Sequence, residues 1–165
     1  MRKFYAFIMV ILLLATLSAC GEAASKTENS EPTTKVEGFA YTFSDVKLFV
    51  GDVFNPEALP EAESVYQVPS CAIEGTDNVY NYGTFELTAF NDGEKETIYS
   101  IYFVDANTPT DEGLYLGDSI AQMESIYGTE YQQNGSEIVY TKGNSKLIFI
   151  VQSDFIISIE FRMAT

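Results

Sequence analysis

The chain has 165 residues, of which 24 are acidic and 9 are basic, and its net charge is −15 at neutral pH. So acidic a protein repels nucleic acid and anionic lipid headgroups, and we expect neither as a partner. It contains no histidine, which removes the usual general base and the commonest metal ligand. We therefore expect no enzyme, no cofactor and no metal centre.

The N-terminus has the pattern of a secretory signal. Arg2 and Lys3 precede an apolar run over residues 4–17, and Leu-Ser-Ala-Cys follows at residues 17–20. The run is shorter than the roughly 20 residues of a membrane-spanning helix. The pattern matches the bacterial lipoprotein signal, which predicts cleavage after residue 19 and lipidation of Cys20. The alternatives are an uncleaved anchor or cleavage at another site.

Lipidation would place the protein on the extracytoplasmic face of the cell membrane, held by its acyl chains. Without Arg2 and Lys3, 24 acidic residues face 7 basic ones, so the net charge becomes −17. Residues 20–37 lack aromatic side chains and are rich in Glu, Ser and Thr, which predicts a disordered linker. Cys71 is then the one remaining thiol, and without histidine or a nearby cation it is expected to be packed rather than reactive.

The first folded half should occupy residues 38–106. Alternating aromatic residues predict a strand over 39–50. Asn55 and Pro56 can begin a helix, which Pro60 should break into two pieces ending near Tyr66. Strands are predicted at 78–82, 85–90 and 97–104, and Asn-Asp-Gly at 91–93 predicts a hairpin turn between the last two.

The second half should occupy residues 107–165. Ser119 and Gln122 form a candidate capping box for a helix that Gly128 ends. Strands are predicted at 137–141, 145–151 and 155–163.

The two halves repeat short words of sequence. Gly-Asp occurs at 51–52 and 117–118, and Glu-Ser-Val-Tyr at 63–66 is similar to Glu-Ser-Ile-Tyr at 124–127. Matching apolar residues lie 60 positions apart in the first two strands of each half and 58 apart in the last. These repeats predict a duplication. The fold class expected is α+β, with two tandem units of helix plus antiparallel sheet.

Two resemblances follow from these motifs. The helix start at 116–119 and its Tyr-Gly stop at 127–128 resemble the β-lactamase inhibitory protein and the small lipoprotein of the outer-membrane assembly machinery. That resemblance implies helices on one face of a sheet and a protein-binding surface on the other. The segment 69–77, PSCAIEGTD, followed by Tyr80, Tyr82 and Phe-Glu-Leu at 85–87, resembles a family of lipoproteins from Gram-positive bacteria, which brings no established activity.

The face of the sheet away from the helices is the first candidate for a functional surface. In the last strand of each half, Tyr99, Ile101 and Phe103, and likewise Ile157, Ile159 and Phe161, should face the helices. The other face would hold the candidate partner-binding residues Phe90, Tyr102, Ile148, Ile150, Ile156 and Glu160. An exposed sheet with apolar anchors and few charges is typical of a protein-binding surface. The alternatives are that the two sheets cover each other, or that loops cover them.

These features predict a membrane-anchored module that binds a protein or envelope component. The rival hypothesis is a small-ligand receptor with a pocket between the units, lined by Tyr80, Tyr82 and Tyr140.

Overall fold

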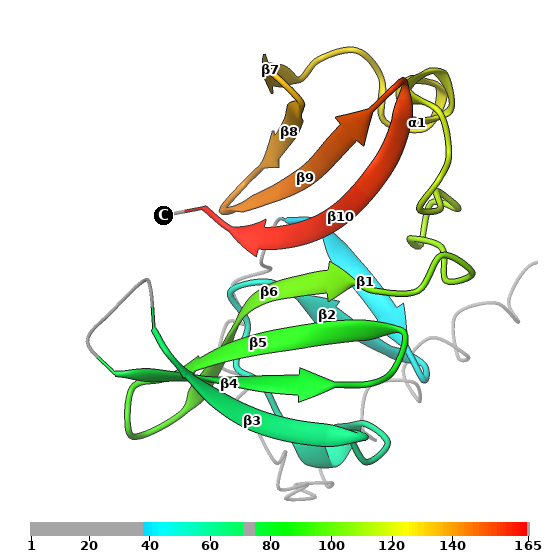
Figure 1. Ribbon diagram of the computed structural model, residues 1–165. Helices are drawn as coiled ribbons and strands as arrows, with labels where there is room; N and C mark the ends of the chain where they lie inside the picture. Colours follow the sequence, from blue (N-terminus) through cyan, green and yellow to red (C-terminus); the bar gives the residue numbers. More distant parts are fainter. Residues whose placement is uncertain (1–37, 71–74, 165) are drawn as a thin grey trace, which may run out of the picture. The chain divides into compact units, whose positions relative to one another are not determined.

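The computed structural model describes residues 38–70 and 75–164. Eight strands form one antiparallel sheet in the order β3-β4-β5-β6-β10-β9-β8-β7 (Figure 1). The first half supplies β3 (Ser64–Pro69), β4 (Thr76–Asn81), β5 (Phe85–Asn91) and β6 (Glu96–Phe103). The second half supplies β7 (Gln132–Asn134), β8 (Glu137–Lys142), β9 (Ser145–Gln152) and β10 (Phe155–Met163).

The α+β prediction of two helix-plus-sheet units is wrong, because the described residues are mostly β-strand. Their one α-helix is α1, Ile120–Tyr127, in the second half. The matching segment of the first half holds only the 3-10 helix η1, Pro56–Ala58. Asn55 caps η1 as expected, but Pro60 cannot donate a backbone hydrogen bond and its ring favours an extended residue before it. Leu59 is extended (φ −112°, ψ 162°), and the helix ends there.

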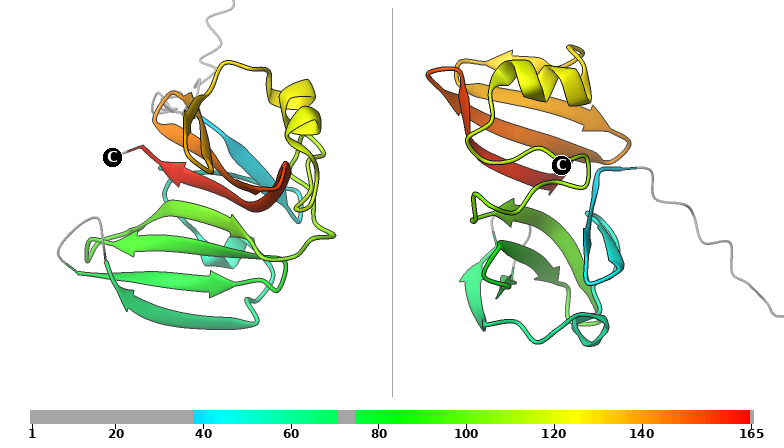
Figure 2. Two further views of the ribbon diagram at one scale, coloured as in Figure 1. Left: turned by 45° about the horizontal axis from the view of Figure 1, so that its top comes forward. Right: turned by 90° about the vertical axis from the view of Figure 1, so that its right-hand side faces the viewer.

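The chain beyond Pro60 continues as a strand. The predicted helix reached Tyr66, yet Tyr66 lies in β3, whose valines and tyrosine suit a pleated sheet. The strand predicted over 39–50 is a separate hairpin of β1 (Ala40–Phe43) and β2 (Val46–Phe49). Ser44 and Asp45 make its turn with positive φ angles of 49° and 66°. Figure 2 shows this hairpin beside the large sheet.

The other predicted elements agree with the structure. Strands occur close to all six positions expected after residue 75. Ser119 and Gln122 form the expected capping box at the start of α1, and Gly128 is its C-cap. The Asn91 side chain accepts a hydrogen bond from the Gly93 amide (2.7 Å) in the turn between β5 and β6.

The sheet is symmetric about its centre, because each strand of the first half has a counterpart at the mirrored position. The Gly-Asp words lie at equivalent places. In the first half the Gly51 amide donates to the Ile98 carbonyl (2.7 Å), and the Ile98 amide donates to the Asp52 carbonyl (2.9 Å). In the second half the Gly117 amide donates to the Ile156 carbonyl, and the Ile156 amide donates to the Asp118 carbonyl, at 2.8 Å each.

One apolar core joins both halves on one face of the sheet. The hairpin contributes Tyr41, whose ring lies against Phe85 and Phe103 at centroid distances of 5.1 and 4.9 Å. Phe103 contacts Phe161 of the other half at 5.8 Å. The Phe39 amide also donates to the buried Ser145 side chain (2.7 Å), so the hairpin is fastened to both halves.

Candidate functional site

The opposite face of the sheet, called the open face below, carries side chains that point away from the core. At its centre, cross-strand pairing places Tyr102 of β6 beside Glu160 of β10, and Glu160 beside Ile148 of β9. Tyr102 has a strand on each side and is still 38% exposed, so no described element lies over it. Three candidate partner-binding residues thus form one row at the middle of the sheet, although Ile148 is buried, with 6% of its surface exposed.

The remaining candidates divide between the faces. Ile150 is the neighbour of Ser158 on the open face, and half-buried Phe90 lies on the same face at the far end of β5. Ile156 does not belong there, since it is 1% exposed and packs in the core. Placing it on the open face was wrong.

A β-bulge in each central strand explains this inversion. Pairing of β10 with β9 skips Ile157, and pairing of β6 with β5 skips Tyr99. An inserted residue reverses the alternation of side chains on one side of it. Ile157, expected in the core, is therefore 52% exposed, whereas Ile98 and Ile156 lie inside.

Charged groups of both signs lie on the open face. Arg162 makes an ion pair with Glu160 (Nη2–Oε2 3.1 Å), and its Nε is buried without a hydrogen-bond partner among the described residues. Burial raises the pKa of Glu160, and the nearby Arg162 partly opposes that rise. Beside this pair, Lys146, Glu137 and Tyr99 line a depression of about 270 Å³.

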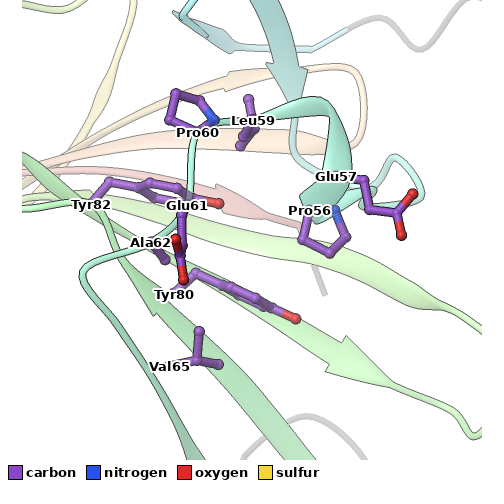
Figure 3. A pocket seen from close by; sticks show the side chains of 9 residues that line it. All are labelled: Pro56, Glu57, Leu59, Pro60, Glu61, Ala62, Val65, Tyr80 and Tyr82. Carbon is purple, nitrogen blue, oxygen red and sulfur yellow. The ribbon is translucent and has the colours of Figure 1, made fainter.

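The three candidate pocket tyrosines do not share a site. Tyr80 and Tyr82 line a recess of about 410 Å³, together with Val65 and residues of the segment 56–62 (Figure 3). This tyrosine recess lies within the first half rather than between the units. Tyr140 lies in the second half, where its hydroxyl donates to the Gly128 carbonyl (2.6 Å).

Tyr80 also has a polar partner that does not belong to the lining of the recess. The Tyr80 hydroxyl donates to Glu96 Oε2 (2.7 Å), and the Asn78 amide donates to the other oxygen of that carboxylate. Burial, followed by the hydrogen bond to Glu96, raises the pKa of Tyr80. Glu96 could not be predicted from the sequence, because one glutamate among many gives no signal before the fold places it beside a tyrosine.

The remaining features considered from the sequence are the two cysteines, a metal site and a membrane-spanning segment. Cys20 and Cys71 lie outside the described residues. Within the described ranges no group of three or more carboxylates or other metal-binding side chains is arranged to hold a metal. No helix there is long and apolar enough to cross a membrane.

No protein-family model matches the chain, and neither a curated protein nor a solved structure matches it significantly. The resemblance to Gram-positive lipoproteins therefore stays a prediction from the motifs. The observations that bear on function are the surfaces of the protein itself.

Proposed function

We propose that this protein is a lipid-anchored, extracytoplasmic binding module that holds a protein or another envelope component on its open face. The observation that supports this most directly is Tyr102, an aromatic side chain exposed in the middle of an eight-stranded sheet. The neighbouring strands β5 and β10 hold the backbone of Tyr102 in place. A partner would therefore gain contact area without having to order a loop. Rigid aromatic anchors are the usual centres of protein-binding surfaces.

The surroundings of Tyr102 fit a partner that is itself a folded surface. Half-buried Ile150 adds apolar area on the same face, and the depression next to Lys146 can receive a protruding side chain. Two of the chain's nine basic residues, Lys146 and Arg162, lie here although the chain as a whole is strongly acidic.

The open face can be tested by site-specific photocrosslinking on intact cells. A benzophenone amino acid at position 102 should crosslink to one discrete species, and the same group at Glu94, an exposed turn position, should not. Adding Phe90→Ala and Ile150→Ala, both at half-buried positions of the open face, to the labelled protein should weaken that crosslink. Equal labelling from positions 102 and 94, or no crosslink from either, would contradict the proposed surface.

Anchoring has a separate test. Replacing Cys20 with serine should abolish the incorporation of a labelled fatty acid into the protein in a bacterial host, because the thioether cannot form. Cys71→Ser is the matched control, and it should be labelled as the wild type is. Labelling of the Cys20→Ser protein at the wild-type level would exclude lipid anchoring at that residue.

A further inference from the structure

Each half of the sheet has a tyrosine at the same position, but the two tyrosines have different surroundings. Tyr80 of β4 pairs with Leu87, and Tyr140 of β8 pairs with Leu147 at the same position of the other half. Two aromatic rings cover Tyr140. Tyr131 meets it edge to face at 5.4 Å between centroids, and Tyr127 of α1 lies at 5.7 Å.

The tyrosine recess lies where the first half lacks those two rings. The 3-10 helix η1 has three residues where α1 has eight, so no counterpart of Tyr127 reaches Tyr80. Val65 pairs with Tyr80 at the edge of the sheet, and continuing the β7–β8 register places Tyr131 opposite Tyr140. A valine therefore stands where the second half has a tyrosine. Phe54 contacts Tyr80 on one side at 4.8 Å, and the recess is the side left open.

An unpaired strand edge borders the recess. β3 is the last strand of the sheet and has a partner on one side only. The Ser70 amide donates inward to the Gly75 carbonyl (3.1 Å), so alternation along an antiparallel strand turns the backbone groups of Val65 and Gln67 outward. Val65 is also 54% exposed. The edge therefore offers hydrogen-bonding groups directly beside an apolar hollow.

Charge indicates what kind of chain fits there. Glu57 and Glu61 line the recess, Glu63 follows them, and no lysine or arginine belongs to its lining. A basic segment would be attracted to this rim, whereas a second copy of this protein would bring its own three glutamates against it.

We infer that the β3 edge and the tyrosine recess bind an extended, basic segment of a partner protein, which adds to the sheet as a ninth strand and places an aromatic side chain over Tyr80. The segment's residue opposite Val65 would project on the same face as Val65, into the recess. Its ring would take the position that Tyr131 holds over Tyr140. This surface is distinct from the open face and does not depend on it.

A library of short linear peptides displayed on phage provides the probe. Selection on the wild-type domain should enrich peptides with an aromatic residue near lysine or arginine. Val65→Tyr should weaken the binding of synthetic versions at least about tenfold, because its ring fills the recess. Gln67→Pro should weaken binding similarly, because it removes an outward amide that the ladder with β4 does not use.

Matched variants separate binding from folding. Gln67→Ala also loses the side-chain bond from Gln67 to Asn78 but keeps the amide, so it should bind as wild type does. Thermal unfolding should show that all three variants are folded. Should one of the two blocking variants fail to fold, the other decides.

Three results would overturn the inference. One is a selection that enriches no peptide, and another is selected peptides that bind Val65→Tyr and Gln67→Pro as tightly as wild type. The third is that the wild-type protein sediments as a dimer and both blocking variants sediment as monomers. A second copy of the protein would then occupy the β3 edge.

Discussion

The Tyr140 hydroxyl ties the end of α1 to β8 through its bond to Gly128. Burial raises the pKa of Tyr140 from 10.0 to about 12. Below pH 10 the hydroxyl is protonated in both the folded and the unfolded chain, and its stabilising contribution is complete. Between pH 10 and about 12 the unfolded chain loses the proton first, so the free energy of unfolding should fall as the pH rises.

Urea unfolding across that pH range tests this. Tyr140→Phe removes the bond to Gly128 and should lower the free energy of unfolding by about 1 kcal/mol at pH 8. It should also make the decline of that free energy above pH 10 shallower. Tyr115→Phe is the control, because that ring is largely exposed and should change neither quantity. An unchanged slope in Tyr140→Phe would show that this hydroxyl does not control the alkaline decline.

At the scale of single residues, the sequence predicted the faces of the sheet only where alternation is unbroken. Ile101, Phe103, Ile159 and Phe161 are in the core as expected. Ile156 was misplaced because a bulge needs just one extra residue, and nothing in the composition of β10 announces it. Its counterpart at Tyr99 shows that the bulge belongs to both halves.

Helix α1 depends on its capping box. Ser119 Oγ accepts from the Gln122 amide (3.2 Å), and the Gln122 side chain accepts from the Ser119 amide (3.0 Å). Ser119→Ala should lower the free energy of unfolding by about 1 kcal/mol in a urea titration. Ser125→Ala, at an exposed position of the same helix, should change it much less. Equal effects would mean that the Ser119 cap adds no more to the free energy of unfolding than an exposed serine within the helix does.

The repeated Gly-Asp words should have equal energetic roles. Gly51 and Gly117 have φ angles of 96° and 93°, where a residue with a Cβ atom is strained. Gly51→Ala and Gly117→Ala should therefore each lower the free energy of unfolding by about 1–2 kcal/mol, as measured by chemical denaturation. A loss at only one of the two positions would contradict their equivalence.

At the scale of elements, one repeated word proved structural and the other did not. The Gly-Asp words meet the last strand of each half in the same way. Ser-Val-Tyr of the first word lies in β3, whereas Glu-Ser-Ile-Tyr lies in α1. Three identical residues out of four cannot fix a conformation when a proline stands shortly before one copy only. The same proline leaves room for the tyrosine recess, which lies within the first half although the sequence predicts a pocket between the units.

At the scale of the molecule, the described residues belong to one compact unit with a single core cluster. A fragment of residues 38–106 would leave Phe103 without Phe161 and β6 without β10. It should lack a cooperative thermal transition in circular dichroism, whereas residues 38–165 should melt in one step. A cooperative melt of the fragment, or two steps in the longer chain, would show that the halves fold independently.

The ladder that joins the halves is unusually short. β6 and β10 pair at three positions, Ser100–Arg162, Ile101–Phe161 and Tyr102–Glu160, whereas β9 and β10 pair at eight. With so few rungs, the two halves depend also on their shared apolar core, where Phe103 contacts Phe161. Two rungs belong to the open face. A partner seated across Tyr102 and Glu160 would bridge both strands of this ladder and should slow amide hydrogen exchange along β6 and β10.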